Sequence, residues 1–339
     1  MKPTSIRQFR GQISRIGAPL FHGWIGKRQL KVSLDRTANI RRGDILMFST
    51  LRNECWRLPY FFDYYRKLGV RHFLLVDNGS TDGLLDYLKS QPDCSCWYTE
   101  ASYKDSNFGV YWMNALLGKY GANHWCLTCD PDEYLVYPHI EERNLHELTE
   151  FLANENRGHL FCLMLDMYGR VPVREAHCAA GQNPLEITPY FDSTGYVQNI
   201  NTFHHDVYVQ GGVRRRVFFR DNPRKAPALN KTPLVYWKRH YAYVSSTHVL
   251  SLLKLNRPHK KDHLCTTGCL LHFKFLSAIV GKASEELQRK QHYANSAEYR
   301  TYHQVFGSGD DSLFCEISTP YKNSAALIDQ GLMNLGQWF

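Results

Sequence analysis

Short apolar runs alternate with segments of helical pattern between residues 45 and 129. The runs that indicate strands are residues 45–50, 73–76, 96–99 and 125–129, and the helical segments are 58–68, 84–90 and 110–120. Gly69 and Gly121 each follow a helical segment, where a glycine commonly ends a helix. A repeated strand–helix succession packs as a parallel, doubly wound sheet that binds ligands at the carboxyl ends of its strands. The sequence therefore predicts an α/β fold.

Polar residues follow three of the four expected strands. They are Asn53-Glu54, Asp77 to Asp82, and Asp130 to Glu133. In extended chain, residues two apart project from the same face, so we expect Asp130 and Asp132 to converge on one point while Glu133 points away. An isolated D-x-D usually only closes a strand, but here three polar signatures fall at strand ends that should meet at one edge of the sheet. Paired carboxylates there suit Mg²⁺ or Mn²⁺, held together with substrate phosphates.

Three motifs between Phe48 and Pro138 carry a family resemblance. They read S-T-L-R-N-E, L-L-V-D-N-G-S-T-D-G and W-C-L-T-C-D-P-D-E-Y-L-V-Y-P. In this order and at this spacing they resemble the family-2-type GT-A glycosyltransferases, most of all a bacterial branch with R-N-E, D-N-G-S-T-D-G and D-x-D-E motifs. The later G-G-V-R-R-R and L-L-H-F-K-F segments are also similar to that branch. The resemblance implies a GT-A-like catalytic domain over residues 45–275 and a nucleotide-sugar donor, with a UDP-sugar favoured.

The resemblance also implies which residues hold the donor nucleotide. The residues matched to the base and ribose positions are Asn53, Glu54, Asp77, Asn78 and Ser80, and Asn114 falls where relatives carry a polar residue. The Asp77 carboxylate can accept from a uracil N3–H and from ribose hydroxyls. For Ser80 and Asp82, a purely structural part in the turn and in capping the next helix is the favoured alternative.

Metal and phosphate contacts are expected from the two aspartates and from two later segments. Asp132 should ligate the metal, Asp130 should ligate it or contact the ribose, and His272 is a further expected ligand. In a strand over residues 270–275, His272 and Lys274 would share one side.

The arginine-rich segment is expected to be a strand in which Arg214 and Arg216 share a face and bind phosphates, with a solvated charged edge as the alternative. An inverting enzyme also needs a base for the acceptor hydroxyl. Asp166, at the end of an expected strand over 160–165, is the first candidate, with Asp192 and Asp206 as rivals.

Basic residues gather in two zones. Residues 1–44 hold ten Lys and Arg against two Asp, and residues 204–261 hold thirteen against two, although the whole chain has a net charge of only +9. An anionic partner, such as a sugar phosphate or a phospholipid headgroup, fits this distribution. We expect residues 1–44 to form a basic arm whose glycines and Pro19 break any long helix. The arm would dock on the protein's own body or touch an anionic membrane. Residues 276–339 are expected to form a helical tail.

The remaining composition narrows the class of protein. No apolar run reaches membrane-spanning length and the first residues lack the core of a signal peptide, so we expect a cytoplasmic protein, with the inner face of the cytoplasmic membrane as an alternative place. Ten scattered cysteines indicate reduced thiols that are mostly buried. Cys126 and Cys129 would point to opposite faces of their strand, which argues against a zinc site.

The combined interpretation is a metal-dependent hexosyltransferase that moves a sugar from a nucleoside diphosphate to a glycan or glycolipid, in bacterial surface polysaccharide or lipopolysaccharide synthesis. A sugar-phosphate nucleotidyltransferase is the first alternative, but it normally needs a glycine-rich phosphate loop where this chain has Arg52-Asn53-Glu54. A basic nucleic-acid-binding module is the second, and it leaves the acidic turns unexplained, so we expect no nucleic acid partner.

Overall fold

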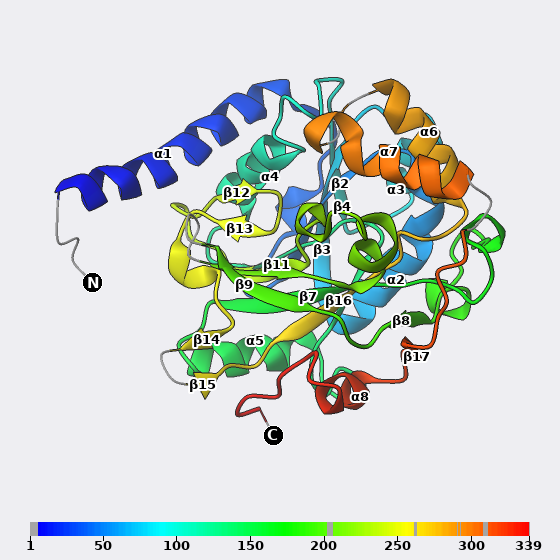
Figure 1. Cartoon of the computed structure of the whole chain (residues 1–339). Coiled ribbons are helices and arrows are strands. Elements are labelled where there is room, and N and C mark those ends of the chain that lie inside the picture. The colour runs from blue at the N-terminus through cyan, green and yellow to red at the C-terminus, as the bar shows by residue number, and fades with distance from the viewer. Residues whose placement is uncertain are drawn as a thin grey trace.

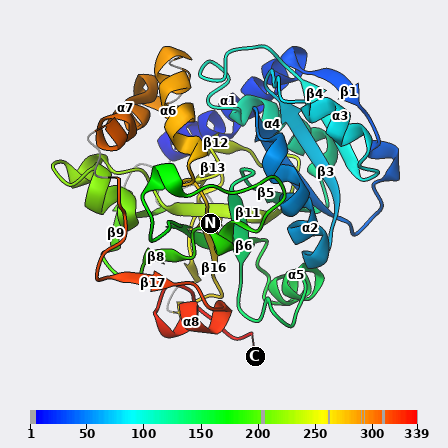
Figure 2. The ribbon, with the colours of Figure 1, turned by 90° about the vertical axis from the view of Figure 1, so that its right-hand side faces the viewer.

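The computed structural model describes residues 6–201, 206–260, 263–289, 291, 293–307 and 311–338. Within these residues, a nine-stranded sheet has the order β1-β4-β3-β2-β5-β11-β7-β16-β6 (Figures 1 and 2). Its strands are β1 Lys31–Leu34, β2 Ile45–Leu51, β3 Val70–Asp77, β4 Cys94–Tyr98, β5 Trp125–Thr128, β6 Glu133–Val136, β7 His159–Asp166, β11 Asn230–Tyr236 and β16 Gly268–His272. In the same described residues, no helix is both long enough and apolar enough to cross a membrane.

Helices and small strand pairs surround this sheet. The helices are α1 Ile6–Gln29, α2 Leu58–Leu68, α3 Leu84–Lys89, α4 Val110–Leu116, α5 Leu145–Asn154, α6 Ala278–Arg289, α7 Tyr293–Gly307 and α8 Ser324–Asp329. The paired strands are β8 Tyr190–Asp192 with β17 Ser318–Pro320, β9 Val197–Asn201 with β10 Asp206–Gln210, β12 Tyr243–Ser245 with β13 Val249–Leu250, and β14 His259–Lys260 with β15 His263–Leu264.

The sheet is mixed, with a parallel centre. Strands β4, β3, β2 and β5 run parallel to one another, as do β7 and β16. β11 lies antiparallel between β5 and β7, and the edge strands β1 and β6 are antiparallel to their neighbours. Each strand and helix expected between residues 45 and 129 is present, so the predicted α/β class is confirmed. The antiparallel β11 was not foreseen.

The central strands are buried on both faces, which explains why they read as continuous apolar runs. Met47 of β2 packs into the core on the side of α2 and α5, whereas its neighbours Leu46 and Phe48 pack into the core on the side of α4. Helix α2 ends as predicted at Gly69, which has φ 108° and donates its N–H to the Arg66 carbonyl. The alternation of β2 and the end of α2 together fix the direction in which the first loops leave the sheet.

The C-terminal region after residue 275 is only partly the helical tail that we expected. Tyr302 of α7 packs on Phe218 and Phe275, and Ile279 and Ala283 of α6 belong to the same separate apolar cluster. The chain then adds β17 to β8 and returns to the main core, where Trp338 is buried. This region is therefore integrated with the body of the protein and contains strand as well as helix.

The expectation that glycines and Pro19 prevent a long N-terminal helix is wrong. α1 runs from Ile6 to Gln29 with Pro19 inside it, and Figure 1 shows it extending outward from the body. Gly23 and Gly26 allow close packing on α4: a Cβ at Gly26 would lie 2.6 Å from the Tyr111 carbonyl. The Trp112 Nε1–H donates to Gln29 Oε1 at 2.7 Å. Tertiary contact with α4 thus outweighs the low helix propensity of glycine.

Substituting Gly26 with alanine should weaken this contact. The added methyl group would meet the main chain of Tyr111, and overpacking of this kind costs about 1–3 kcal/mol of unfolding free energy. Gly17 is the matched control, because nothing lies within 4 Å of its Cβ position and φ is not positive there. Gly17→Ala should be neutral or stabilise by about 0.5–1 kcal/mol. Urea unfolding followed by tryptophan fluorescence, with limited proteolysis of α1, measures both; equal effects would contradict the packing argument.

Candidate active site

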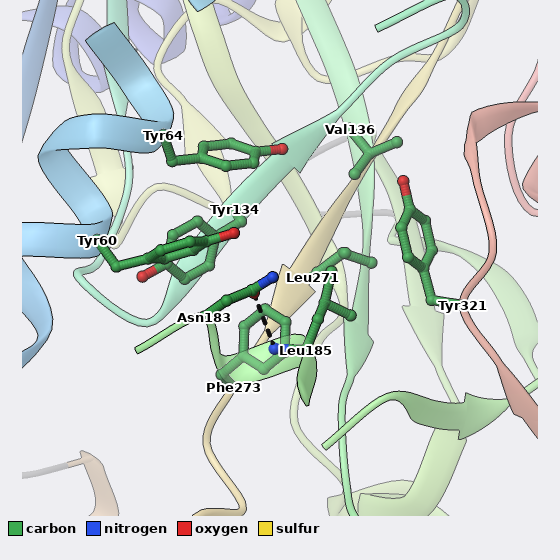
Figure 3. A pocket seen from close by; sticks show the side chains of 9 residues that line it. All are labelled: Tyr60, Tyr64, Tyr134, Val136, Asn183, Leu185, Leu271, Phe273 and Tyr321. Carbon is green, nitrogen blue, oxygen red and sulfur yellow. Dashed lines mark hydrogen bonds between the residues drawn. The ribbon is translucent and has the colours of Figure 1, made fainter. Parts of the chain in front are cut away.

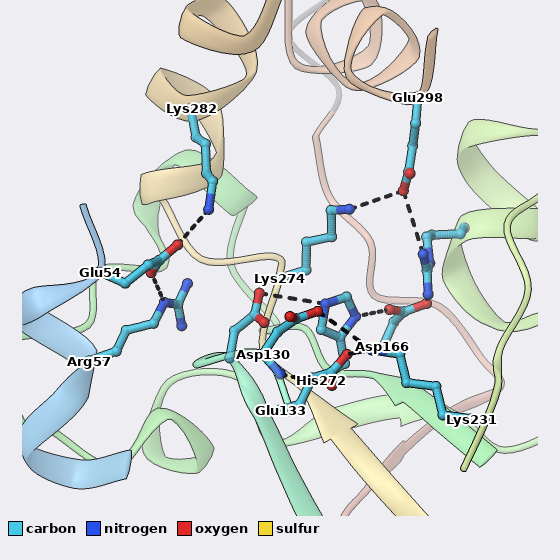
Figure 4. Close-up of polar contacts among 12 residues, drawn as sticks. Glu54, Arg57, Asp130, Glu133, Asp166, Lys231, His272, Lys274, Lys282 and Glu298 are labelled. Atoms are coloured by element: carbon cyan, nitrogen blue, oxygen red, sulfur yellow. Dashed lines mark hydrogen bonds and ion pairs between the residues drawn. The ribbon is translucent and has the colours of Figure 1, made fainter. Parts of the chain in front are cut away.

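His272 lies at the centre of a polar cluster at the carboxyl end of β16. In the sheet it is in register with Asp166 of the parallel neighbour β7 and with Glu133 of the antiparallel neighbour β6. Its Nδ1 lies 2.6 Å from Asp166 Oδ1 (Figure 4), and its Nε2 lies 3.5 Å from Asp132 Oδ2. Residues more than 100 positions apart are therefore brought together by strand register.

The two carboxylates control the charge of His272. Burial lowers the pKa of the imidazole, but Asp132 and Asp166 outweigh that effect and raise it to about 8. Burial likewise raises the pKa of Asp132, yet His272, together with Arg57 and Lys282, holds it well below its usual range. Asp132 is consequently a carboxylate at neutral pH, with cations on several sides.

A chain of alternating charges continues from Asp166. Arg214 Nε donates to Asp166 Oδ2 at 2.7 Å, and Arg214 Nη1 lies 3.5 Å from Glu298 Oε1. The same Glu298 oxygen accepts from Lys274 Nζ at 3.0 Å. Burial raises the pKa of Glu298, but Lys274 and Arg214 lower it to about 2. Figure 4 shows this chain leading from the strand ends up to α7.

The structure corrects the expected geometry of the D-x-D. β5 ends at Thr128, and Asp130 and Asp132 lie in a tight turn closed by a hydrogen bond from the Glu133 N–H to the Asp130 carbonyl. They therefore do not share a strand face. Asp132 faces His272, whereas the Asp130 side chain is 53% exposed and lies 3.5 Å from Lys231 Nζ.

Glu133 is buried and paired with a cation, although we expected it to point away. Its carboxylate forms an ion pair with Lys231 of β11, which is itself buried. Burial raises the pKa of Glu133, and the opposing attraction of Lys231 does not cancel that effect. Burial lowers the pKa of Lys231, but Glu133 and Asp130 outweigh it and raise the value. This ion pair lies next to the D-x-D turn, because Lys231 also approaches Asp130.

Two further cations, Arg57 and Lys282, act on Asp132 and are paired with Glu54. Arg57 Nε donates to Glu54 Oε2 at 2.8 Å, and Lys282 of α6 donates to Glu54 Oε1. Burial lowers the pKa of both cations, but Glu54 and, to a smaller extent, Asp132 outweigh that effect and raise it. Glu54, which we expected to contact a nucleotide, thus holds two cations next to Asp132.

The loops after β2 and β3 are joined by side-chain hydrogen bonds. Ser80 Oγ accepts from the Asn53 N–H at 3.0 Å, and Asn53 Oδ1 accepts from the Thr81 N–H at 2.8 Å. Asp82 Oδ2 accepts from the Cys55 N–H at 2.8 Å. The expected capping of α3 by Ser80 or Asp82 is wrong, because Gly83 occupies the N-cap position without a side-chain cap. Both residues connect the two loops instead.

The other expected nucleotide residues also have protein partners. Asp77 Oδ1 accepts from the Ser80 N–H at 2.8 Å, and Asn78 donates to the carbonyls of Thr99 and Ala101. Asn114 is buried in α4, and both ends of its amide are bonded to the backbone of Tyr243. Asp77 and Asn78 are therefore oriented residues at the sheet edge, and Asn114 connects α4 to β12.

The segment with three arginines is a short helical turn, Arg214–Phe218, and the expected strand is wrong. Arg214 and Arg216 consequently bind different carboxylates. Arg216 makes a two-pronged contact with Asp192, at 2.8 and 2.9 Å. β16 ends at His272, so Lys274 lies beyond the strand and reaches Glu298 of α7. Neither arginine is placed on a solvated sheet edge.

The expected base, Asp166, has surroundings that suit a different role. Its side chain is fully buried, and its two oxygens are bonded to His272 and Arg214. Burial raises its pKa, but Arg214 and His272 lower it below its usual range. A proton acceptor must reach the substrate hydroxyl, so Asp166 is better described as the residue that orients His272. The rival Asp192 is held by Arg216 and Tyr168, and the side chain of Asp206 lies outside the described residues.

The side chains of this cluster can supply only some of the ligands that a divalent cation needs. Among the described residues, no group of three or more His, Cys, Asp and Glu side chains could hold a metal ion. Asp132 and His272 nevertheless face each other with 3.5 Å between Oδ2 and Nε2, a separation compatible with two ligands of one ion. The Asp166 contact fixes the ring of His272, as carboxylates commonly do for metal-binding histidines. The protein therefore offers two ligands, and substrate and water oxygens would complete the shell.

Four charged residues of this cluster were not singled out from the sequence. They are Arg57, Lys231, Lys282 and Glu298. Lys231 gave no clear signal, because β11 was not foreseen and its neighbours Asn230 and Thr232 are polar. Arg57, three residues after Glu54, offered a weak signal. Lys282 and Glu298 lie in helices whose docking on the site depends on tertiary structure.

An aromatic cavity lies on the α2 side of β6. Figure 3 shows the rings of Tyr60, Tyr64 and Tyr134 around it, with Tyr321 opposite. Its volume is about 70 Å³, which is too small for a nucleotide. The cavity therefore belongs to the packing behind the site.

The ten cysteines are free, as the sequence predicted. Cys126 and Cys129 are buried thiols, and burial raises the pKa of both.

Comparison with known proteins adds no family assignment. No protein-family model matches the chain, and no curated protein matches its sequence.

The buried ion pair of Glu133 and Lys231 should be strongly coupled. Lys231→Met leaves a buried carboxylate without its cation, which typically costs about 3–5 kcal/mol of unfolding free energy. Adding Glu133→Gln should recover at least about 1 kcal/mol of that loss, because residues in contact are not additive. Lys89→Met is the control, since its ion pair with Asp86 is exposed and should contribute little. Urea unfolding of these variants and of Glu133→Gln alone completes the comparison; strictly additive effects of the two substitutions would contradict the coupling.

Proposed function

We propose that this protein is a metal-dependent glycosyltransferase that transfers a sugar from a UDP-sugar to a glycan or glycolipid acceptor. The observation that carries the proposal is the arrangement of Asp132, His272 and Asp166 at the carboxyl end of the sheet. Ligands of open α/β sheets bind at that end. The loops that hold Asn53 and Asp77 leave the sheet from neighbouring parallel strands at the same end.

The roles of the cluster follow from its charges. A divalent ion on Asp132 and His272 would act as a Lewis acid on the diphosphate of the donor. Arg57 and Lys282 stand beside Asp132 and supply fixed positive charge where the leaving diphosphate gains negative charge. Asp166 orients His272, and Arg214 keeps Asp166 ionised. Asp130, the exposed carboxylate of the turn, would contact the ribose or the ion.

The two alternatives account for fewer of these contacts. A nucleotidyltransferase would use a glycine-rich phosphate loop, whereas the loop after β2 is built from Arg52, Asn53 and Glu54. A nucleic-acid-binding surface requires accessible cations. In the basic zone over residues 204–261, Arg214 and Lys231 are buried in ion pairs and Arg216 is held by Asp192. These three cations therefore do not contribute to such a surface, although Lys238 and Lys254 of the same zone are exposed.

Removing the Asp132 carboxylate should weaken metal-dependent nucleotide binding. UDP with Mn²⁺ should bind more tightly than GDP or CMP with Mn²⁺, and Asp132→Ala should weaken UDP binding by at least about tenfold. His272→Ala should have the milder effect, because the Asp132 carboxylate and the substrate oxygens still hold the ion. Asp63→Ala, an exposed carboxylate of α2, is the matched control. Calorimetric titration with and without Mn²⁺ tests this, and unchanged metal dependence in Asp132→Ala would overturn the proposed function.

We further propose that α1 makes peripheral contact with an anionic membrane near the acceptor. Phe21 and Trp24 are 56% and 51% exposed, and their rings are stacked with 5.9 Å between centroids. Arg28 lies over the Trp24 ring at 3.8 Å, and Lys27 adds a second cation to the last turn. Exposed aromatic rings beside basic residues favour the interface of an anionic bilayer.

Serine at both aromatic positions should reduce vesicle binding. The Phe21→Ser/Trp24→Ser variant should sediment with anionic liposomes about tenfold more weakly than the wild-type protein, because both rings leave the interface. Val32→Ser, at an equally exposed apolar residue of β1, is the control. Binding of the wild-type protein should also fall as salt is added. Equal sedimentation of the double variant and the control would exclude this role of α1.

A further inference from the structure

A large cavity lies at the end of the sheet opposite the candidate active site. Its volume is about 620 Å³. It is lined at the start of β5 and β7 by Trp125 and His159, and at the end of β11 by Tyr236. Because β11 runs antiparallel to β5 and β7, these three strand ends meet at one edge. Asp132 and His272 lie beyond the other edge, so the two sites are separated by the length of the strands.

The cavity is strongly basic. Among the described residues, four cations and no aspartate or glutamate line it; the cations are Arg157, Lys238, Lys254 and Arg257. Glu155 acts electrostatically on Arg157 but is not part of the lining. Lys238 and Lys254 are exposed at the rim, whereas Arg157 is buried. Such a surface attracts a ligand that carries at least one phosphate or carboxylate.

Two buried side chains of the lining have polar atoms without a hydrogen-bond partner among the described residues. Arg157 is 5% exposed; its Nη1 donates to the Thr266 carbonyl at 3.0 Å, while Nη2 has no partner. His159 is 8% exposed, and its Nε2 contacts the Arg257 carbonyl at 3.1 Å, while Nδ1 has no partner. A buried guanidinium donor without a partner is costly, which is a reason to expect a ligand oxygen there.

The protonation state of His159 indicates which kind of ligand group its Nδ1 can bind. Burial lowers its pKa to about 4, so the ring is neutral at physiological pH. Nε2 faces a carbonyl oxygen and must carry the proton, which leaves Nδ1 as an acceptor. A ligand hydroxyl would satisfy that acceptor, just as a phosphate oxygen would satisfy Arg157.

Aromatic rings complete the lining. Trp125 and Tyr236 lie 5.7 Å apart at an interplanar angle of 61°, and Tyr241 lines the same cavity. Aromatic faces offer large apolar contact to the ring of a sugar, and the volume lies within the range of small-molecule sites.

We propose that this cavity binds a phosphorylated sugar. Its phosphate lies on Arg157 and the rim lysines, and a sugar hydroxyl donates to His159 Nδ1. The site is separate from the candidate active site and does not rest on the proposed glycosyltransferase activity. A soluble sugar phosphate and a lipid headgroup with a polyhydroxylated ring share this chemistry.

Calorimetric titration of the full chain with glucose 6-phosphate tests the proposal. The wild-type protein should bind glucose 6-phosphate more tightly than inorganic phosphate or glucose, because phosphate and hydroxyl contacts act together. Lys238→Ala/Lys254→Ala should weaken binding about tenfold, since two charge-assisted contacts are lost. Both side chains are exposed, so the variant should fold. Arg157→Gln should weaken binding further, and its unfolding transition shows whether its fold is intact.

Lys67→Ala, an exposed lysine of α2, is the matched control for lost charge, and Asp132→Ala controls for the other end of the sheet; both should bind as the wild-type protein does. Vesicles that contain phosphatidylinositol distinguish the source: a response of vesicle binding alone to the lysine substitutions would make the ligand lipid-borne. Loss of glucose 6-phosphate binding in Asp132→Ala but not in the lysine variant would overturn the proposal. An equal loss in Lys67→Ala, or no effect of the lysine substitutions on either probe, would also overturn it.

Discussion

The contact of His272 with Asp132 and Asp166 is the interaction on which the cluster depends. Buried charges are tolerated only when each has a partner of opposite sign. His272 contacts Asp132 through Nε2 and Asp166 through Nδ1, and Arg214 donates to the second carboxylate oxygen of Asp166. Glu298 then offsets Arg214, which ends the chain at the partly exposed edge of the cluster. Removing any member would leave a neighbouring charge uncompensated, so these residues form one electrostatic unit.

Strand register is what assembles this unit. Asp166 and His272 are the last residues of two parallel strands, so both leave the sheet at the same level. The tight turn after β5 then allows β6 to return antiparallel to β16, which places Asp132 beside His272. A shift of β16 by one residue would turn His272 to the other face. The function proposed for the site therefore depends on the pairing of β16 with both neighbours.

Local patterns were sufficient to predict the first half of the sheet. The strands around Phe48 and Val76 are apolar on both faces, and Gly69 ends α2 through its positive φ. These signals are local in the sequence, because burial and capping act within a few residues. The proximity of Asp132 and His272 was expected from the family resemblance and not from such local signals, because the two residues are more than 100 positions apart in the sequence.

Errors arose where tertiary contacts outweigh local preference. α1 is helical despite Gly26 because close approach to α4 requires a residue without a side chain there. The arginine segment is a helical turn, which lets Arg214 reach Asp166 of β7. Lys231 was counted with a basic surface zone, but burial beside Glu133 makes it part of the site. A charge count cannot distinguish an exposed lysine from one that compensates a buried carboxylate.

The antiparallel strand β11 gives the two ends of the sheet different chemistry. Its residue Lys231 lies beneath the D-x-D turn, while its last residue, Tyr236, lines the basic cavity at the opposite edge. At the first edge, cations are matched by carboxylates, and the diphosphate that we propose there would bring a metal ion to balance its charge. At the second edge, Arg157 and the rim lysines face a cavity with no carboxylate among the described residues that line it, which suits an anion without a metal. One strand thus connects the site proposed for a metal–diphosphate with the site proposed for a sugar phosphate.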